Sequence, residues 1–280
     1  MLGWIDIHTH IGRLLRDREP LTVDDLLRWM DAQGIERAVI MAVESPEEVD
    51  FYVTTEQVLA TCAAHPDRLI PFCAVDPRHR YPGEFEPLPI LREYADRGCR
   101  GVGEVLAGVP VDDPLMQAIY AACAELGLPI TLHMDDYILR DGIGLPGLER
   151  MLREFPDTVF IGHAQHFWAE ISAEVDEAYL RRRYPTEPVV PGGAVDRLLS
   201  EYPNLYGDLS AGSGYHALSR DPTFGREFLI RHQDKLLFGT DYLTPGQPTP
   251  IIDLLREMDL PQAVLRKIGC ENAIQLLGLA

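Results

Sequence analysis

Lysine is almost absent from this sequence of 280 residues. Of its 25 basic residues only Lys235 and Lys267 are lysines, and 44 acidic residues bring the formal net charge to −19. Proteins that bind nucleic acid or anionic membranes gather basic residues against phosphate groups, so this balance argues against both kinds of partner. We therefore expect a small-molecule substrate.

Long apolar runs and paired cysteine motifs are also missing. No apolar run approaches the ~20 residues of a membrane helix, and the first residues do not resemble a leader peptide. The five cysteines are scattered and odd in number, which favours a reduced protein. Walker loops, dinucleotide-binding turns and nucleophile elbows do not occur either. We expect a soluble, unprocessed protein of the cytoplasm.

Segments typical of strands and helices alternate eight times along the chain. The predicted strands begin near residues 2, 37, 69, 100, 129, 158, 204 and 235, at nearly even intervals except once. Strands that alternate with helices favour a parallel sheet, and eight such units in a chain of this length predict a closed (β/α)₈ barrel, the TIM barrel. Helices expected over 251–258, 261–268 and 272–277 complete one domain over residues 1–280.

The one long interval between predicted strands contains an insertion over residues 165–191. It mixes acidic and apolar residues, carries three consecutive arginines and ends in a proline-rich stretch. In a barrel this segment, which follows the sixth strand, would lie over the catalytic face as a lid. A solvated helical hairpin without a role in function is the alternative.

Two histidines one residue apart end the first predicted strand, in the sequence IDIHTH over residues 5–10. Alternate residues of a strand point the same way, so His8 and His10 can aim both imidazoles at one point. Imidazole is the commonest metal ligand, and two of them make half of a divalent metal site. Taken alone, the pair favours a strand end that is merely polar over a metal site.

Ligand-type residues also stand at the ends of other predicted strands, which is where barrel enzymes place their active sites. Together with the first two histidines they are Glu104, His133, His163 and Asp241. Each one alone could be an ordinary polar residue of a strand end or loop. The presence of four of the nine histidines at strand ends on one face favours a metal site. Asp76 and Asp208 share this position and are left outside the predicted site.

Four short motifs carry a resemblance to a known family. IDIHTH at the start, LH after the fifth strand, IGH after the sixth and FGTD after the eighth resemble the amidohydrolase superfamily, in particular its amidohydrolase-related (amidohydrolase 2) branch of TIM-barrel hydrolases and decarboxylases. The match spans residues 5–241. The resemblance implies a divalent metal, usually zinc, with manganese or iron as alternatives. It implies as ligands His8, His10, His133 and Asp241, with His163 as a general acid or base.

The number of metal ions stays open. The superfamily includes two-metal members, in which a residue of strand 4 bridges the ions and the histidines of strands 5 and 6 hold the second one. The phrase GVGE over residues 101–104 resembles the glutamate version seen in TatD-like members. The resemblance therefore allows either one metal ion or two, with Glu104 and His163 as the additional ligands.

Four residues in the predicted loops are candidates for substrate binding. They are Arg13, Tyr137, Arg140 and Arg220, which follow strands 1, 5 and 7. Arginine forks suit carboxylates, so we expect a small anionic substrate. Arg13 is closest in sequence to the histidine pair, and a plain surface salt bridge is its alternative role.

The expected chemistry follows from a zinc ion with an open coordination position, which lowers the pKa of a bound water to roughly 7. Asp241 can hold the metal and accept that water's proton, and His163 can protonate a leaving group or polarise a carbonyl. A hydrolase acting on an amide, ester or lactone is the first hypothesis, and a non-oxidative decarboxylase is the second. A metal-binding barrel without catalysis is the third, against which His163 argues. The sequence leaves the oligomeric state open, a homo-oligomer included.

Overall fold

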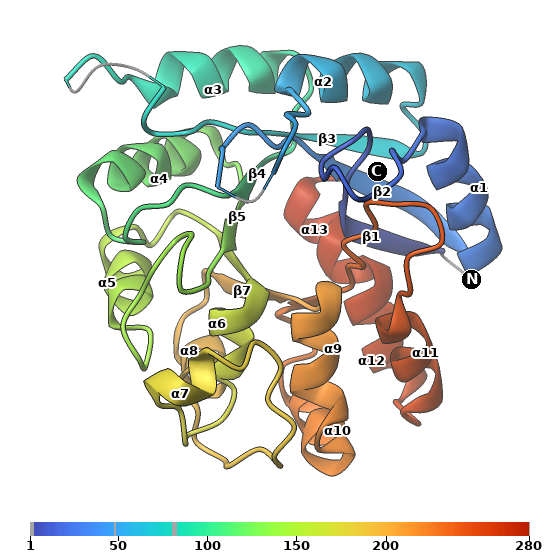
Figure 1. The fold of residues 1–280 in the computed structure, drawn as a ribbon, viewed down its shortest axis with the longest axis vertical. Coiled ribbons are helices and arrows are strands. Elements are labelled where there is room, and N and C mark those ends of the chain that lie inside the picture. Colours follow the sequence, from blue (N-terminus) through green and yellow to red (C-terminus); the bar gives the residue numbers. More distant parts are fainter. Residues whose placement is uncertain (1–2, 48, 80–82, 280) are drawn as a thin grey trace.

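Eight parallel strands form the centre of the structure (Figure 1). It is a computed structural model that describes residues 3–47, 49–79 and 83–279. The strands are paired in sequence order from β1 to β8, which confirms the predicted TIM barrel. Their bounds are β1 Trp4–Thr9, β2 Ile35–Met41, β3 Leu69–Cys73, β4 Gly101–Val105, β5 Ile130–His133, β6 Phe160–His163, β7 Leu205–Asp208 and β8 Leu236–Leu237.

Backbone hydrogen bonds join the last strand region to the first and close the barrel. The Ile7 amide donates to the Phe238 carbonyl at 3.0 Å, and the Asp241 amide donates to the His8 carbonyl at 2.8 Å. The second bond lies beyond the end of β8, so residues that follow this short strand continue along β1. Closure therefore places the FGTD segment directly beside the His-x-His pair.

Helices surround the strands, and several begin and end where the sequence indicates. Thr22 caps α1 by accepting from the Asp25 amide, and Gly34 ends that helix in the left-handed conformation at φ 72°. The bounds are α1 Val23–Gln33, α2 Thr55–Ala64, α3 Pro87–Asp96, α4 Pro114–Leu126, α5 Pro146–Glu154, α6 Ala164–Ala169, α7 Glu177–Leu180, α8 Ala194–Glu201, α9 Ala211–Ser219, α10 Pro222–Arg231, α11 Pro250–Glu257, α12 Gln262–Arg266, the π-helical turn Lys267–Glu271 and α13 Asn272–Leu277.

Three helices, α6, α7 and α9, have no counterpart among the helix ranges predicted from the sequence. Helix α6 begins immediately after His163, and α9 begins three residues after β7 ends. Glycines at 212 and 214 weaken the helical signal of α9, because glycine is a poor helix former. The Gly214 position is nevertheless needed, since a Cβ there would lie 2.3 Å from the Leu209 carbonyl oxygen.

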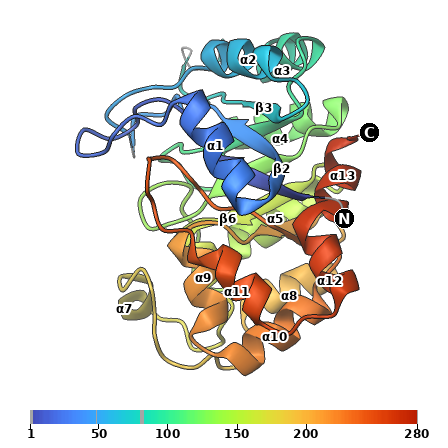
Figure 2. The same cartoon turned by 90° about the vertical axis from the view of Figure 1, so that its right-hand side faces the viewer.

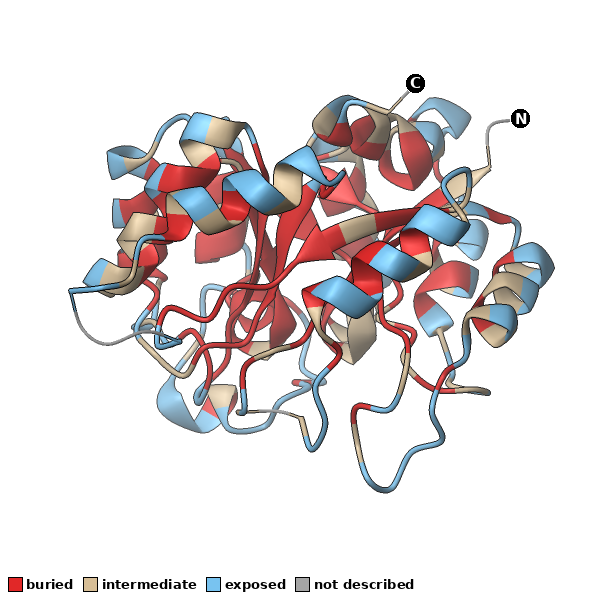
Figure 3. Ribbon diagram, turned by 90° about the horizontal axis from the view of Figure 1, so that it is seen from above, coloured by how far each residue is buried: buried red, intermediate tan, exposed pale blue. Residues whose placement is uncertain are grey.

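The core has two layers, one inside the barrel and one between the strands and the helices. The strands themselves are buried (Figure 3). On β2, Val39 and Met41 belong to the cluster inside the barrel, whereas Ala38 and Ile40 pack in the larger cluster between strands and helices. This alternation is the period of two that a strand imposes. The polar residues at the carboxyl ends of the strands therefore lie next to the apolar cluster inside the barrel.

The loops that follow the strands lie on one side of the barrel, and both chain ends lie on the opposite side (Figure 2). Helix α7, which belongs to the 165–191 insertion, lies on the side of the loops. Its action as a moving lid stays a prediction. Among the described residues, no helix combines the length and apolar character that crossing a membrane requires.

Gly162, just before His163, gives the first prediction. A Cβ at this position would lie 2.2 Å from Cε2 of the buried Phe167 ring, so the Gly162→Ala variant should lose about 1–3 kcal/mol of unfolding free energy through overpacking. Chemical denaturation measures this loss. A double variant with Phe167→Leu should recover part of it, because the smaller side chain vacates the position. Additive losses would contradict the proposed contact.

Candidate metal centre

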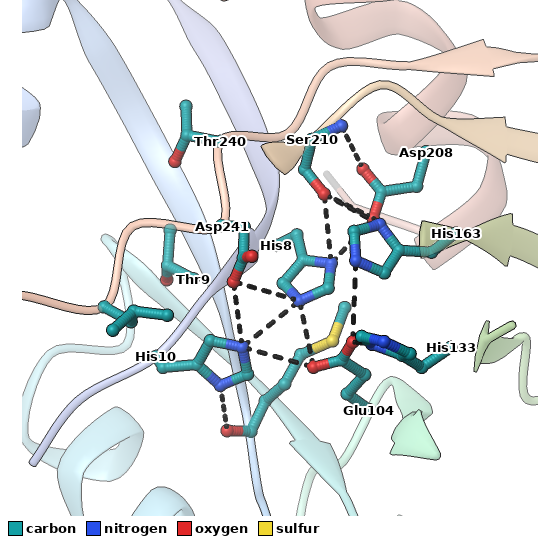
Figure 4. A network of polar contacts seen from close by, with 12 residues as sticks. His8, Thr9, His10, Glu104, His133, His163, Asp208, Ser210, Thr240 and Asp241 are labelled. Carbon is teal, nitrogen blue, oxygen red and sulfur yellow. Dashed lines mark hydrogen bonds and ion pairs between the residues drawn. The ribbon is translucent and has the colours of Figure 1, made fainter. Parts of the chain in front are cut away.

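Four ligand-type atoms converge at the ends of β1, β4 and β8 (Figure 4). Nε2 of His8 and Nε2 of His10 are 3.2 Å apart, and Oε2 of Glu104 is 3.4 Å from each of them. Oδ1 of Asp241 is 3.7 Å from the first imidazole and 3.4 Å from the second. A tetrahedral ion with bonds of roughly 2.0–2.2 Å separates its ligand atoms by about 3.3–3.6 Å. The atoms of His8, His10 and Glu104 therefore have the mutual spacing of ligands on one divalent metal, and Asp241 lies within 3.7 Å of both imidazoles.

A second group of ligand-type atoms shares the same glutamate. Oε1 of Glu104 lies 2.5 Å from Nδ1 of His133 and 3.5 Å from Nε2 of His163. The carboxylate thus turns one oxygen to each group. Oε2 of Glu104 faces His8 and His10, which Asp241 also approaches. Oε1 of Glu104 contacts His133. This arrangement differs from the ligand set implied by the family resemblance, which placed His133 in the first group.

Asp208, which was not predicted as a site residue, contacts one histidine of each group. Its Oδ2 lies 2.6 Å from Nδ1 of His8 and 3.0 Å from Nδ1 of His163. The Ser210 hydroxyl donates to the same oxygen at 2.8 Å. A carboxylate on Nδ1 leaves Nε2 of an imidazole free to bind a metal, which is a common arrangement behind metal ligands. The available signal was its position at the end of β7, the same signal that selected the other residues.

The buried charges shift one another's pKa values. Burial opposes the charged form of His8, but Glu104 and Asp208 outweigh it and raise the pKa of this imidazole well above its usual value. Burial would raise the pKa of Glu104, yet His8 and His133 hold it well below its usual range. Against the same burial penalty, His8 and His163 lower the pKa of Asp208. Both carboxylates are therefore ionised at neutral pH, as metal ligands and their supports must be.

Backbone geometry at the barrel seam holds the last ligand in place. Asp241 has a left-handed conformation with φ 56°, and its amide donates to the His8 carbonyl. Asp tolerates this conformation better than most residues. On β1, the fully buried Asp6 accepts from the Thr240 amide at 3.0 Å and from the Thr240 hydroxyl at 2.6 Å. Burial raises the pKa of Asp6 to about 7 despite these donors.

The four predicted substrate-binding residues lie outside the helices and strands, and the three arginines among them donate to nearby groups. Nη2 of Arg13 donates to the Arg16 carbonyl at 3.0 Å, and the guanidinium lies 4.9 Å from the Phe51 ring centre. Arg140 donates from Nη1 to the carbonyls of residues 108 and 137, and the side chain of Tyr137 is exposed. Arg220 donates to the hydroxyl of residue 179 in the insertion. Their roles toward a substrate stay predictions.

An eight-stranded parallel barrel with a buried His, Glu and Asp cluster at its strand ends is the architecture of a metal-dependent barrel enzyme. The sequence matches the amidohydrolase family over residues 5–279, and the chain belongs to this family. The resemblance drawn from the four motifs is thereby confirmed. No curated protein matches the chain in sequence.

Solved structures share the fold over the whole chain at low identity. A TIM-barrel protein of uncharacterised function from Bordetella bronchiseptica has a TM-score of 0.68 and 19% identity, covering 99% of each chain. A probable 2-pyrone-4,6-dicarboxylic acid hydrolase from Acinetobacter baumannii with citric acid bound has a TM-score of 0.65 and 14% identity, over 99% of this chain and 100% of that one. A dihydroxybenzoic acid decarboxylase from Polaromonas sp. JS666, with manganese and 2-nitroresorcinol, has a TM-score of 0.63 and 18% identity, over 100% and 98%.

Asp208→Asn should weaken the affinity for zinc or manganese about 10- to 100-fold, because the amide supports the histidines less well than a carboxylate. Competition with a chromophoric chelator measures the affinity. Asp76→Asn is the matched control: Asp76 is also a buried carboxylate after a strand, but its partners include Arg78 and the Ser45 hydroxyl. Equal metal affinity in the wild type and Asp208→Asn would contradict the supporting role.

Proposed function

We propose that this protein is a metal-dependent hydrolase that cleaves an amide, ester or lactone bond of a small anionic molecule. The observation that carries the proposal is the shared carboxylate of Glu104, which offers one oxygen to each of two groups of ligand-type atoms. A bridging carboxylate between two metal positions suits the activation of a water molecule and the polarisation of the bond that it attacks.

The donor set favours a zinc ion in the first position. Imidazole nitrogens and carboxylate oxygens also suit manganese and iron, so geometry and availability decide among them. A divalent ion bound there supplies a water of lowered pKa and a Lewis acid for the substrate carbonyl. Support for a metal in general comes from the ligand-like spacing of the His8, His10 and Glu104 atoms described above.

Two residues of the chain are suited to move protons. The Asp241 side chain is 22% exposed, against 7% or less for the other three residues of its group, so it is the one that can reach an attacking water and accept its proton. His163 is held through Nδ1 by Asp208 and has its Nε2 directed toward Glu104. It can serve as the general acid when one ion is bound, or hold the second ion when two are bound.

The substrate is proposed to carry a carboxylate and a flat apolar part. Arg13, Tyr137, Arg140 and Arg220 remain the candidates for recognising it. Exposed aromatic side chains also occur in loops that follow strands, with Phe51 and Tyr52 after β2 and Tyr137 after β5. The structural neighbours bound to citric acid and to a nitroresorcinol are compatible with such a ligand. We propose a cytoplasmic location, which the five free cysteines support.

Decarboxylation of a small carboxylated substrate is the second candidate. It is favoured by the dihydroxybenzoic acid decarboxylase among the structural neighbours, which binds manganese on the same fold. The metal-loaded protein should be assayed in parallel for CO₂ release from aromatic carboxylic acids and for hydrolysis of lactones, esters and amides. Activity on neither set, with metal bound, would leave the non-catalytic barrel as the better hypothesis.

Asp241→Asn should lower kcat about 10²- to 10⁴-fold, the usual contribution of a proton-transfer group. Arg13→Met should instead raise KM with a smaller effect on kcat, because Arg13 is proposed to bind the substrate and not to take part in bond cleavage. Steady-state kinetics with the substrate found in the assay separates the two effects. Arg16→Met is the control, since Arg16 is exposed and its amide and side chain face Asp50. Unchanged kcat in Asp241→Asn would refute the assigned role.

Glu104→Gln tests the number of ions. If the carboxylate bridges two positions, elemental analysis should show about two equivalents of metal in the wild type and about one or fewer in the variant, because an amide is a poorer bridge than a carboxylate. One equivalent in both proteins, with an unchanged rate, would assign Glu104 a structural role and leave His163 as the acid of a one-metal enzyme.

A further inference from the structure

A small cavity lies between α6, α9 and the 165–191 insertion. Gln165 and Trp168 line it from α6, Ser213 and Arg220 from α9 and its C-terminal end, and Arg183 from the insertion. The cavity has room for one small occupant, a water molecule or a monatomic ion.

Residues that line this cavity carry unpartnered polar atoms. Within the described part of the chain, Nε and Nη2 of Arg220, Oγ of Ser213 and Oε1 of Gln165 are buried and have no hydrogen-bond partner. The Ser213 side chain is almost fully buried, at 3% exposure. Buried polar groups in folded proteins are nearly always satisfied, and four such atoms on residues that line one cavity indicate an occupant that binds them.

The electrostatics of the cavity indicate the charge of that occupant. The remaining nitrogen of Arg220, Nη1, donates to the Tyr179 hydroxyl, which is uncharged. Among the described residues that line the cavity there is no aspartate or glutamate, whereas Arg183 and Arg220 both contribute to it. A buried guanidinium without a counter-ion is costly, and a water molecule would leave its charge uncompensated.

We propose that this cavity is a binding site for one small monovalent anion of the size of chloride. Arg220 would donate from Nε and Nη2, and Ser213 from its hydroxyl. The Gln165 amide can turn its NH₂ group toward the ion, since rotation by half a turn exchanges its nitrogen and oxygen. The site shares no residue with the metal centre, and the inference does not rest on the proposed function. Arg220, a candidate for substrate recognition above, would bind the anion in place of the substrate.

Such an ion would tie the insertion to the barrel. Tyr179 and Arg183 come from the insertion, while Ser213 and Arg220 belong to α9 and its end. Helix α9 begins directly after Ser210, whose hydroxyl lies 3.0 Å from Nδ1 of His163. The anion would therefore order the insertion against the helix that starts at the metal centre.

Crystals grown with sodium bromide in place of chloride test the occupant directly. Bromide scatters anomalously, and we expect a peak within hydrogen-bonding distance of Nε or Nη2 of Arg220 and of Ser213 Oγ. A fully occupied water at this position without an anomalous peak would overturn the proposal.

Thermal unfolding provides the solution test. At constant ionic strength, replacing sodium gluconate by sodium chloride should raise the Tm of the wild type along a one-site saturation curve, because gluconate is too large for the cavity. In Arg220→Met the apparent chloride affinity should fall about tenfold or more, since a hydrogen bond to a charged group is worth at least a factor of ten in an equilibrium constant. A wild-type Tm that does not distinguish the two salts would refute the site.

Two further variants separate an ion site from a structural contact. In gluconate, Arg220→Met should be at least as stable as the wild type, because it removes an uncompensated buried charge. If Arg220 served only to hold Tyr179, the variant would lose the same Tm in both salts, which would contradict the proposal. Arg181→Met is the control, because Arg181 is exposed in the same insertion and pairs with Glu177; its chloride response should match the wild type. Ser213→Ala should weaken the chloride response without abolishing it.

Discussion

The hydrogen bond from the Asp241 amide to the His8 carbonyl is the contact on which the site depends most. It forms where the barrel closes, between residues that are separated by almost the entire chain. Because β8 covers only Leu236–Leu237, the residues after it are held chiefly by their bonds to β1 and by the buried carboxylate of Asp6. Closure of the sheet and assembly of the ligand group are therefore one event. A fault at this seam would separate Asp241 from the two histidines.

A second constraint is the balance of charge in a buried place. Glu104 and Asp208 are carboxylates removed from water. His8 and His163 contact both of them, and His10 and His133 contact Glu104 as well. Burial of unpaired carboxylates would be prohibitive, so these groups are stable only as a network or with a cation among them. The same network determines which nitrogen of each histidine can face a ligand. The supporting carboxylate is thus as much a part of the centre as the ligand-type atoms themselves.

The surroundings of the centre differ in how firmly they are tied to it. Helices α6 and α9 begin at the ends of β6 and β7, beside His163 and Ser210, and they contact each other through buried side chains. The insertion packs on these helices with charged and aromatic groups, including Arg220 and the stacked rings of Tyr184 and His216. If Arg220 binds the proposed anion, the packing of the insertion on these helices depends on the anions in solution, whereas the apolar core of the barrel does not.

The sequence by itself determined the barrel, its family and most of the cluster. Strand and helix periods are local properties, so the alternation of segments predicts the fold, and residues at strand ends such as His8, His10 and Asp241 must then gather at one face. The pairing of Glu104 with both groups, and the support of the histidines by Asp208, were decided only by the tertiary structure. The same holds for α9 and for the directions of Arg13 and Arg220. The direction of a side chain at a strand end depends on strand register, barrel twist and the loops packed around it. These are set by contacts between residues distant in sequence, which no local pattern encodes.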